Sequence, residues 1–139
     1  MLFENMLRGC DKHGCGAFNA PRGERHHRGL DIQCLKCQKV LSPVAGHVTK
    51  IGACYSKKDK EKSRYRYIEI DFQTHLRIRI LYVSPFVVEG QDILKGQFIG
   101  QQQGLGVVYK GIREHIHLEL LENGKRIDPI RFFNEFCLT

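Results

Sequence analysis

The chain has 139 residues, 42% of them hydrophobic, which is enough for a single domain around one core. No apolar run approaches the roughly 20 residues that cross a bilayer, and residues 1–8 are too short and too interrupted to be the apolar stretch of a signal peptide. The net charge of +7 predicts a general attraction to acidic partners, but no nucleic-acid-binding motif accompanies it.

The first expected elements are a small loop and two short strands. Cys10 and Cys15 bracket four residues, of which Gly14 would let the loop close. An apolar strand is expected over 30–34, and another over 44–51 after a turn.

Lysines and arginines crowd the stretch that begins at Lys57 and ends at Arg66. Acidic residues interrupt it, so we interpret it as a solvated hairpin loop; the alternative is a site for glycosaminoglycan or another polyanion. Strict alternation of apolar and polar residues then predicts two half-buried antiparallel strands over 66–72 and 76–82. The tight turn between them indicates a hairpin, with His75 at its end.

The C-terminal third is expected to contain short strands and then a helix. Gly90, Gly96 and Gly100 punctuate apolar residues, as is typical of short strands joined by tight turns. A clear strand is predicted over 115–121, and Asp128 followed by a proline predicts one short C-terminal helix. The predicted fold class is mainly β, an antiparallel sheet or barrel-like single domain with that helix.

Six cysteines are many for a chain of this length. In an extracellular protein they would form up to three disulfides, and the four after the first pair allow three connectivities. In a reducing compartment all six would be thiols. The spacing of Cys34 and Cys37 also permits a separate structural zinc site completed by distant residues. The four later cysteines are Cys34, Cys37, Cys54 and Cys137.

Two histidine patterns carry the chemistry. His115 and His117 are two apart on a predicted strand and share one face with Glu119. His27 and Asp31 form a His-x-x-x-Asp pattern that leads into an apolar strand. Each pattern alone is typical of a protein surface, but imidazoles and a carboxylate together are zinc ligands. The remaining histidines, His13, His26 and His47, are interpreted as surface or turn residues.

The two patterns together resemble the lysostaphin-type zinc metallopeptidases, the glycyl-glycine endopeptidases. Segments 42–48 and 90–100 also look like this family's turn and glycine-spaced strands, and the resemblance covers roughly residues 22–133. It implies one Zn²⁺ per chain held by His27, Asp31 and His117, with His115 as a catalytic histidine. Residues 1–21 would then be an N-terminal extension with a small cysteine loop, and 22–139 the zinc-binding domain.

A closer resemblance is to the chemotaxin-2 family, secreted vertebrate signalling proteins built on the same fold. It rests on the segment from Cys10 to Gly16, on Ala20-x-Arg22, and on the spacing of His27, Gly29, Asp31 and Cys34. It implies a Cys10–Cys15 disulfide and an extracellular location; otherwise we expect a role in an intracellular assembly. The family's N-terminal partner for Cys34 is absent from this sequence.

The resemblance also bears on activity. In the peptidases, zinc lowers the pKa of a bound water to about 7, and two further histidines move protons. One of these positions is occupied by Tyr82, whose phenol is a poor base at neutral pH. We therefore favour a non-catalytic zinc-binding protein with a protein partner or receptor. The alternative is an active metalloendopeptidase that cleaves glycine-rich or peptidoglycan-type peptides.

Overall fold

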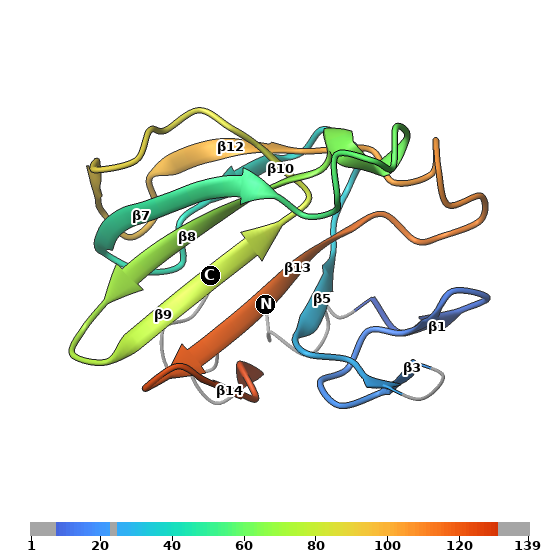
Figure 1. Ribbon diagram of the computed structural model, residues 1–139, viewed down its shortest axis with the longest axis horizontal. Helices are drawn as coiled ribbons and strands as arrows, with labels where there is room; N and C mark the ends of the chain where they lie inside the picture. The colour runs from blue at the N-terminus through green and yellow to red at the C-terminus, as the bar shows by residue number, and fades with distance from the viewer. Residues whose placement is uncertain (1–7, 23–24, 131–139) are drawn as a thin grey trace.

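The computed structural model describes residues 8–22 and 25–130, which form two antiparallel sheets and two small hairpins (Figure 1). The larger sheet has the order β11-β7-β8-β9-β13-β14, and β5 also pairs with β13. Its strands are β5 (Leu30–Gln33), β7 (Gly46–Ala53), β8 (Arg66–Phe72), β9 (Leu76–Leu81), β11 (Asp92–Ile93), β13 (His115–Glu122) and β14 (Lys125–Ile127).

The smaller sheet has the order β10-β12-β6, and its strands β12 and β10 lie above β7 in Figure 1. Its strands are β6 (Lys39–Leu41), β10 (Val83–Pro85) and β12 (Phe98–Gln102). The two hairpins lie beside β5 and pair β1 (Cys10–Asp11) with β2 (Gly14–Cys15), and β3 (Pro21–Arg22) with β4 (Arg25–His26). The predicted fold class is thereby confirmed as mainly antiparallel β.

Period-two alternation accounts for the central hairpin. On β8 and β9 the isoleucine pairs Ile68–Ile80 and Ile70–Ile78 face each other in register, and all four side chains are fully buried. The polar residues between them leave the opposite face. The connecting turn contains His75, whose φ of 68° suits a hairpin end. The hairpin predicted from sequence is thus confirmed.

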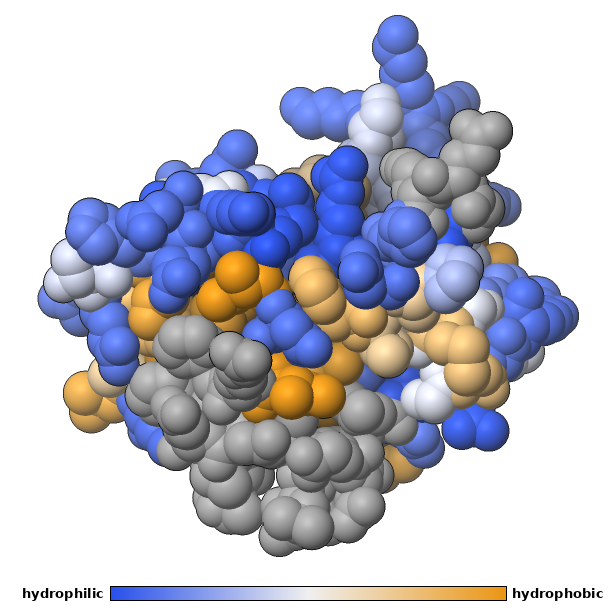
Figure 2. Space-filling view, turned by 90° about the horizontal axis from the view of Figure 1, so that it is seen from below, coloured by the Kyte–Doolittle hydropathy of each residue, from blue (hydrophilic) through white to orange (hydrophobic). Residues whose placement is uncertain are grey.

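The core fills the space between the two sheets with aliphatic side chains. It comprises Leu30, Ile32, Val40, Val44, Val48, Ile68, Ile70, Phe72, Leu76, Ile78, Ile80, Val83, Val87, Ile93, Ile99, Leu118 and Leu120. Partly buried Ile116, Ile127 and Ile130 pack against it. Seen from below, hydrophobic residues gather across the middle of the face, with hydrophilic ones above them (Figure 2).

One predicted strand ends one residue early, and one predicted helix lies mostly outside the described residues. The strand expected over 76–82 ends at Leu81, because Tyr82 has a φ of 71° and directs the chain from the larger sheet into β10 of the smaller one. The C-terminal helix expected from Asp128 onward falls mostly on residues 131–139, outside the described residues. In the part of the chain that is described, no helix has the length and apolarity to cross a membrane.

The basic stretch that begins at Lys57 lies in the connection between β7 and β8, which contains the 3-10 helix η2 (Lys62–Arg64). Lys57, Lys58 and Lys60 are exposed, as expected for a solvated loop. Lys62 differs, because its ammonium lies 5.5 Å from the centre of the Tyr55 ring and 5.2 Å from that of Tyr109. Cation–π contacts of Lys62 with these two rings therefore fix the end of this loop to the rest of the domain.

Candidate metal centre

Three side chains that could hold a metal ion meet where β5 pairs with β13. Asp31 and His117 are direct partners in the antiparallel register, and His27 precedes β5. The distances are 2.8 Å from His117 Nδ1 to Asp31 Oδ1, 3.0 Å from His27 Nε2 to His117 Nδ1, and 3.1 Å from His27 Nε2 to Asp31 Oδ1. Strand pairing thus joins segments 86 residues apart in sequence.

The spacing of these three atoms fits a metal ion. Tetrahedral zinc ligands with bonds of 2.0–2.1 Å lie ~3.3 Å from one another, only slightly farther apart than the distances here. Asp31 and His117 are 2% and 7% exposed, and His27 is 8% exposed. Among the described residues, this is the one group of three histidine, cysteine or acidic side chains close enough to hold an ion.

Neighbouring hydrogen-bond acceptors determine which nitrogen of His27 and of His117 faces the other two residues of the His27, Asp31 and His117 group. His27 Nδ1–H donates to the carbonyl of Ala17 at 2.9 Å, which leaves Nε2 directed at the other ligands. His117 Nε2–H donates to the carboxylate of Glu119 at 3.1 Å, which leaves Nδ1 directed inward. Such outer partners orient metal-binding imidazoles and raise their basicity.

The electrostatics of the group favour a positive charge at its centre. Burial raises the pKa of Asp31, but the adjacent imidazoles of His117 and His27 outweigh burial and hold that pKa well below its usual range. Burial likewise lowers the pKa of His117, yet the Asp31 and Glu119 carboxylates outweigh it and raise the pKa to about 9. In the metal-free protein a proton on His117 therefore occupies the position that a metal ion would take.

Glycine is required at position 29 by the close packing of this region. A Cβ on Gly29 would lie 2.1 Å from the Leu118 carbonyl oxygen and 2.7 Å from His117 Nε2.

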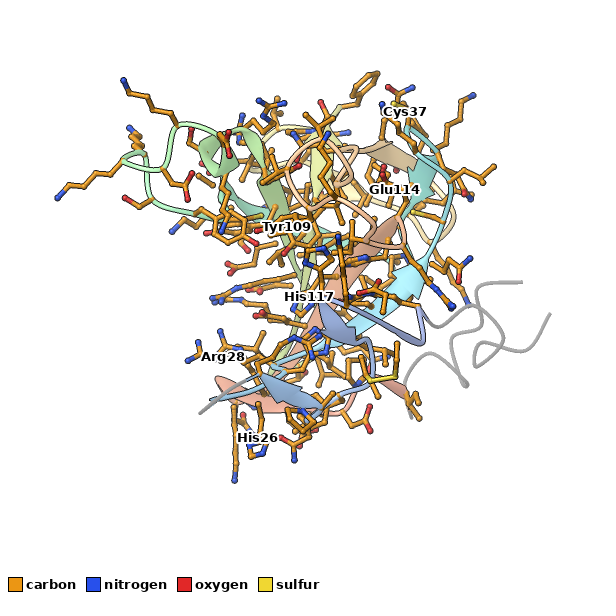
Figure 3. All side chains as sticks on the ribbon, turned by 90° about the vertical axis from the view of Figure 1, so that its right-hand side faces the viewer. His26, Arg28, Cys37, Tyr109, Glu114 and His117 are labelled. Carbon is orange, nitrogen blue, oxygen red and sulfur yellow. A yellow bond between two sulfur atoms is a disulfide. The ribbon has the colours of Figure 1, made fainter. Side chains whose placement is uncertain are left out.

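The residues that flank His27 in sequence point elsewhere. His117 lies in the interior, whereas the side chains of His26 and Arg28 point to solvent (Figure 3). The alternation of buried and exposed residues just before β5 thus directs His27, and not His26, toward the group.

His115 lies beside the group on the same face of β13. Its Nδ1–H donates to the Arg113 carbonyl at 2.7 Å, which leaves Nε2 3.4 Å from Asp31 Oδ2. Burial lowers the pKa of His115, so its imidazole is neutral at neutral pH. An unprotonated nitrogen in this position can accept a proton.

Tyr82 contacts the same region, and its hydroxyl is hydrogen-bonded to a neighbouring tyrosine. Its ring meets those of His115 and His117 edge-on, at centroid distances of 5.7 and 6.5 Å. Its hydroxyl lies 2.9 Å from that of Tyr55, which accepts a hydrogen bond from the hydroxyl of Tyr109. Burial raises the pKa of Tyr82, so the phenol stays protonated.

A cavity of about 240 Å³ opens beside the group. Its walls include the three candidate metal ligands, His115, His13 and the tyrosines Tyr55, Tyr82 and Tyr109. His75 does not line it and lies at the far hairpin end, next to a different cavity. The site therefore has room for a small ligand or a segment of peptide.

Several residues of this centre were not identified from sequence. Glu119 was expected on the same face as the histidines, but its hydrogen bond to His117 was not. Arg8, Tyr55 and Tyr109 give no local signal, because they reach the centre from loops and from the N-terminal segment.

The cysteines separate into one disulfide and free thiols. Cys10 and Cys15 are bonded and face each other in the β1–β2 ladder, as the family resemblance implied. Cys34, Cys37 and Cys54 are free, and Cys137 lies outside the described residues. In the described chain no metal-binding group forms around Cys34 and Cys37, which gives no support to a second zinc site.

The comparisons with solved structures identify the class of fold. Lysostaphin, the antimicrobial peptidase from Staphylococcus simulans, superimposes with a TM-score of 0.67 at 19% identity, over 88% of this chain and 49% of that one. A zinc-containing peptidase from Vibrio cholerae gives 0.63 at 22% identity, over 88% and 38%. This chain spans about half or less of either. It has the lysostaphin-type peptidase fold, as predicted.

Sequence relatives identify the family within that fold. The chain is 32% identical to leukocyte cell-derived chemotaxin-2 of Mus musculus over 115 residues, 83% of this chain and 73% of the mouse protein. It is 34% identical to myeloid protein 1 of Gallus gallus over 134 residues, 90% of this chain and 37% of the chicken protein. Residues 4–131 match a family model described as "Domain of unknown function (DUF8155) N-terminal domain". The chain belongs to the family that this model describes and, by its identity to the mouse protein, to the family of leukocyte cell-derived chemotaxin-2.

Proposed function

We propose that this protein is a non-catalytic, zinc-binding chemotaxin-like protein that binds a protein partner or receptor outside the cell. One Zn²⁺ per chain is assigned to His27, Asp31 and His117. Two imidazoles and a carboxylate are a zinc donor set, and one solved neighbour of the same fold is described as zinc-containing. Bound zinc would add folding free energy by linking the segment before β5 to β13.

The observation that carries the non-catalytic assignment is the environment of Tyr82. Its hydroxyl is hydrogen-bonded to Tyr55, and burial raises its pKa further above that of an ordinary phenol. It therefore cannot act as a base at neutral pH. Loss of one acid–base group typically costs about 100- to 10,000-fold in rate.

A second candidate function is supported by His115. Its neutral Nε2 lies beside the metal group and lines a cavity of about 240 Å³. A protein with this one base would be a slow metalloendopeptidase for glycine-rich or peptidoglycan-type peptides.

Cleavage of an oligoglycine peptide by zinc-loaded protein distinguishes the two functions. We expect no turnover above that of chelator-treated protein, and no change on His115→Ala. A second variant, Tyr82→His, tests whether a base at this position restores cleavage; histidine tolerates a positive φ better than most residues. Turnover in the unmodified protein that His115→Ala removes would overturn the non-catalytic assignment.

The extracellular assignment is supported by the Cys10–Cys15 disulfide and by the names of the chemotaxin relatives. Binding of labelled protein to cells tests the partner. We expect saturable binding that protease treatment of the cells removes. Binding that is lost on heparinase treatment would instead assign the partner as a polyanion bound by the exposed lysines of the 57–66 loop.

A further inference from the structure

The N-terminal segment from Arg8 to Arg22 encloses the residues assigned to zinc. Arg8 N donates to the Asp31 carbonyl at 3.0 Å, and Asp31 N donates to the Gly16 carbonyl at 2.8 Å. His27 N donates to the Ala20 carbonyl at 2.7 Å. Figure 1 shows β1 and β3 of this segment beside β5. This segment therefore holds the backbone of two of the three residues assigned to zinc, His27 and Asp31.

The Arg8 side chain contacts the metal-ligating carboxylate directly. Arg8 is 2% exposed, and its Nη1 donates to Asp31 Oδ2 at 2.8 Å. The other carboxylate oxygen, Oδ1, faces His27 and His117. Arg8 thus binds the oxygen that does not face His27 and His117, and fixes the rotation of the carboxylate.

Arg8 is itself held by the small disulfide loop. Its Nε and Nη2 donate to the two carboxylate oxygens of Asp11 at 3.1 and 2.6 Å. Asp11 lies between Cys10 and Cys15, and it also accepts hydrogen bonds from the backbone N–H groups of His13 and Arg113 at 2.8 and 3.0 Å. A continuous set of contacts therefore runs from the disulfide through Asp11 and Arg8 to Asp31.

We propose that Arg8 is a positioning residue for the metal ligand Asp31, and that the Cys10–Cys15 loop holds Arg8 in place for this role. Zinc affinity then depends on a residue and a disulfide that contact no metal. The inference rests on the proposed zinc site.

Zinc affinity by chelator competition tests this, with the free thiols alkylated so that they do not bind metal. We expect Arg8→Gln to weaken zinc binding by about 10- to 100-fold, the usual effect of removing an outer partner of a ligand. Arg8→Lys should recover only part of the loss, because an ammonium cannot bridge two carboxylates as a guanidinium does. The matched control is Arg28→Gln. Arg28 lies between His27 and Asp31 in sequence but is exposed, so this change should leave the zinc affinity unchanged.

Two further variants separate positioning from folding. Asp11→Asn retains Arg8 but weakens its anchor, and Cys10→Ser with Cys15→Ser opens the loop; each should also weaken zinc binding. These two decide the result if Arg8→Gln does not fold. The inference would be refuted if a folded variant without Arg8 bound zinc as tightly as the unmodified protein. It would also be refuted if the Asp11→Asn variant and the double cysteine variant both did so. If the unmodified protein itself binds no zinc, the proposed function fails instead.

Discussion

Substitution of Gly29 by alanine tests how tightly β5 and β13 must pack for the metal group to form. The backbone of Gly29 does not have a positive φ, so alanine introduces no backbone strain and the cost is steric. The new Cβ would lie 2.1 Å from a carbonyl oxygen of β13 and 2.7 Å from the His117 ring, and backbone is the harder of the two to move. Overpacking of this kind costs about 1–3 kcal/mol.

In a chain of this size each kcal/mol lowers Tm by about 3–5 °C, so Gly29→Ala should lower Tm by about 3–15 °C. The strand that moves carries His117, so bound zinc should fall as well. Circular dichroism and elemental analysis measure the two effects. The matched control is Gly104→Ala, because the three atoms nearest to its Cβ would all belong to the flexible side chain of Lys36. A Gly29→Ala variant with the melting temperature and metal content of the unmodified protein would refute the packing argument.

Two other predictions concern pH and backbone conformation. Because the pKa of His117 is raised to about 9, zinc should release close to one proton at pH 7.5, and its affinity should rise with pH until about pH 9. Calorimetry in two buffers of different ionisation enthalpy measures this; a heat that does not depend on the buffer would contradict it. In the metal-free protein the pH dependence of the folding stability has the opposite sign. The raised pKa of His117 stabilises the fold fully below about pH 6.5, and this stability is lost as the pH rises through about 9. Gly96 has a φ of 85° with open space around it, so Gly96→Ala should cost about 1–2 kcal/mol from backbone strain alone. An unaltered melting curve for Gly96→Ala would show that the turn does not require a positive φ at position 96.

The main sheet could be predicted from sequence where the signal is local. Alternation along β8, β9 and β13 determines which side chains enter the core, and it placed His115, His117 and Glu119 on one face. The pairing of β5 with β13 could not be derived in this way, because it joins distant segments. Only the resemblance to a known family suggested that His27 and Asp31 would meet His117.

Tyr82 shows where alternation fails. Period-two counting places its side chain on the core face with Ile78 and Ile80, but its φ of 71° turns the ring toward His115 and His117. The change of direction occurs because the chain leaves one sheet and enters the other at this residue. A residue that changes sheets has no periodic signal in the sequence.

The N-terminal contacts could not be predicted for a different reason. Arg8 is a single basic residue in a short segment, and charge in such a position is usually solvated. Its burial depends on two carboxylates, Asp11 and Asp31, that the fold brings together. Sequence showed the cysteine pair beside it but not what the loop holds.

The zinc content of purified protein after dialysis against metal-free buffer tests the assigned ligands most directly. The free thiols should be alkylated first, so that only the histidine and carboxylate site is counted. Close to one zinc per chain is expected for the unmodified protein, and well below one for Asp31→Ala and for His117→Ala, with a lower melting temperature for both. The same zinc content in all three proteins would contradict the assignment of the metal to His27, Asp31 and His117.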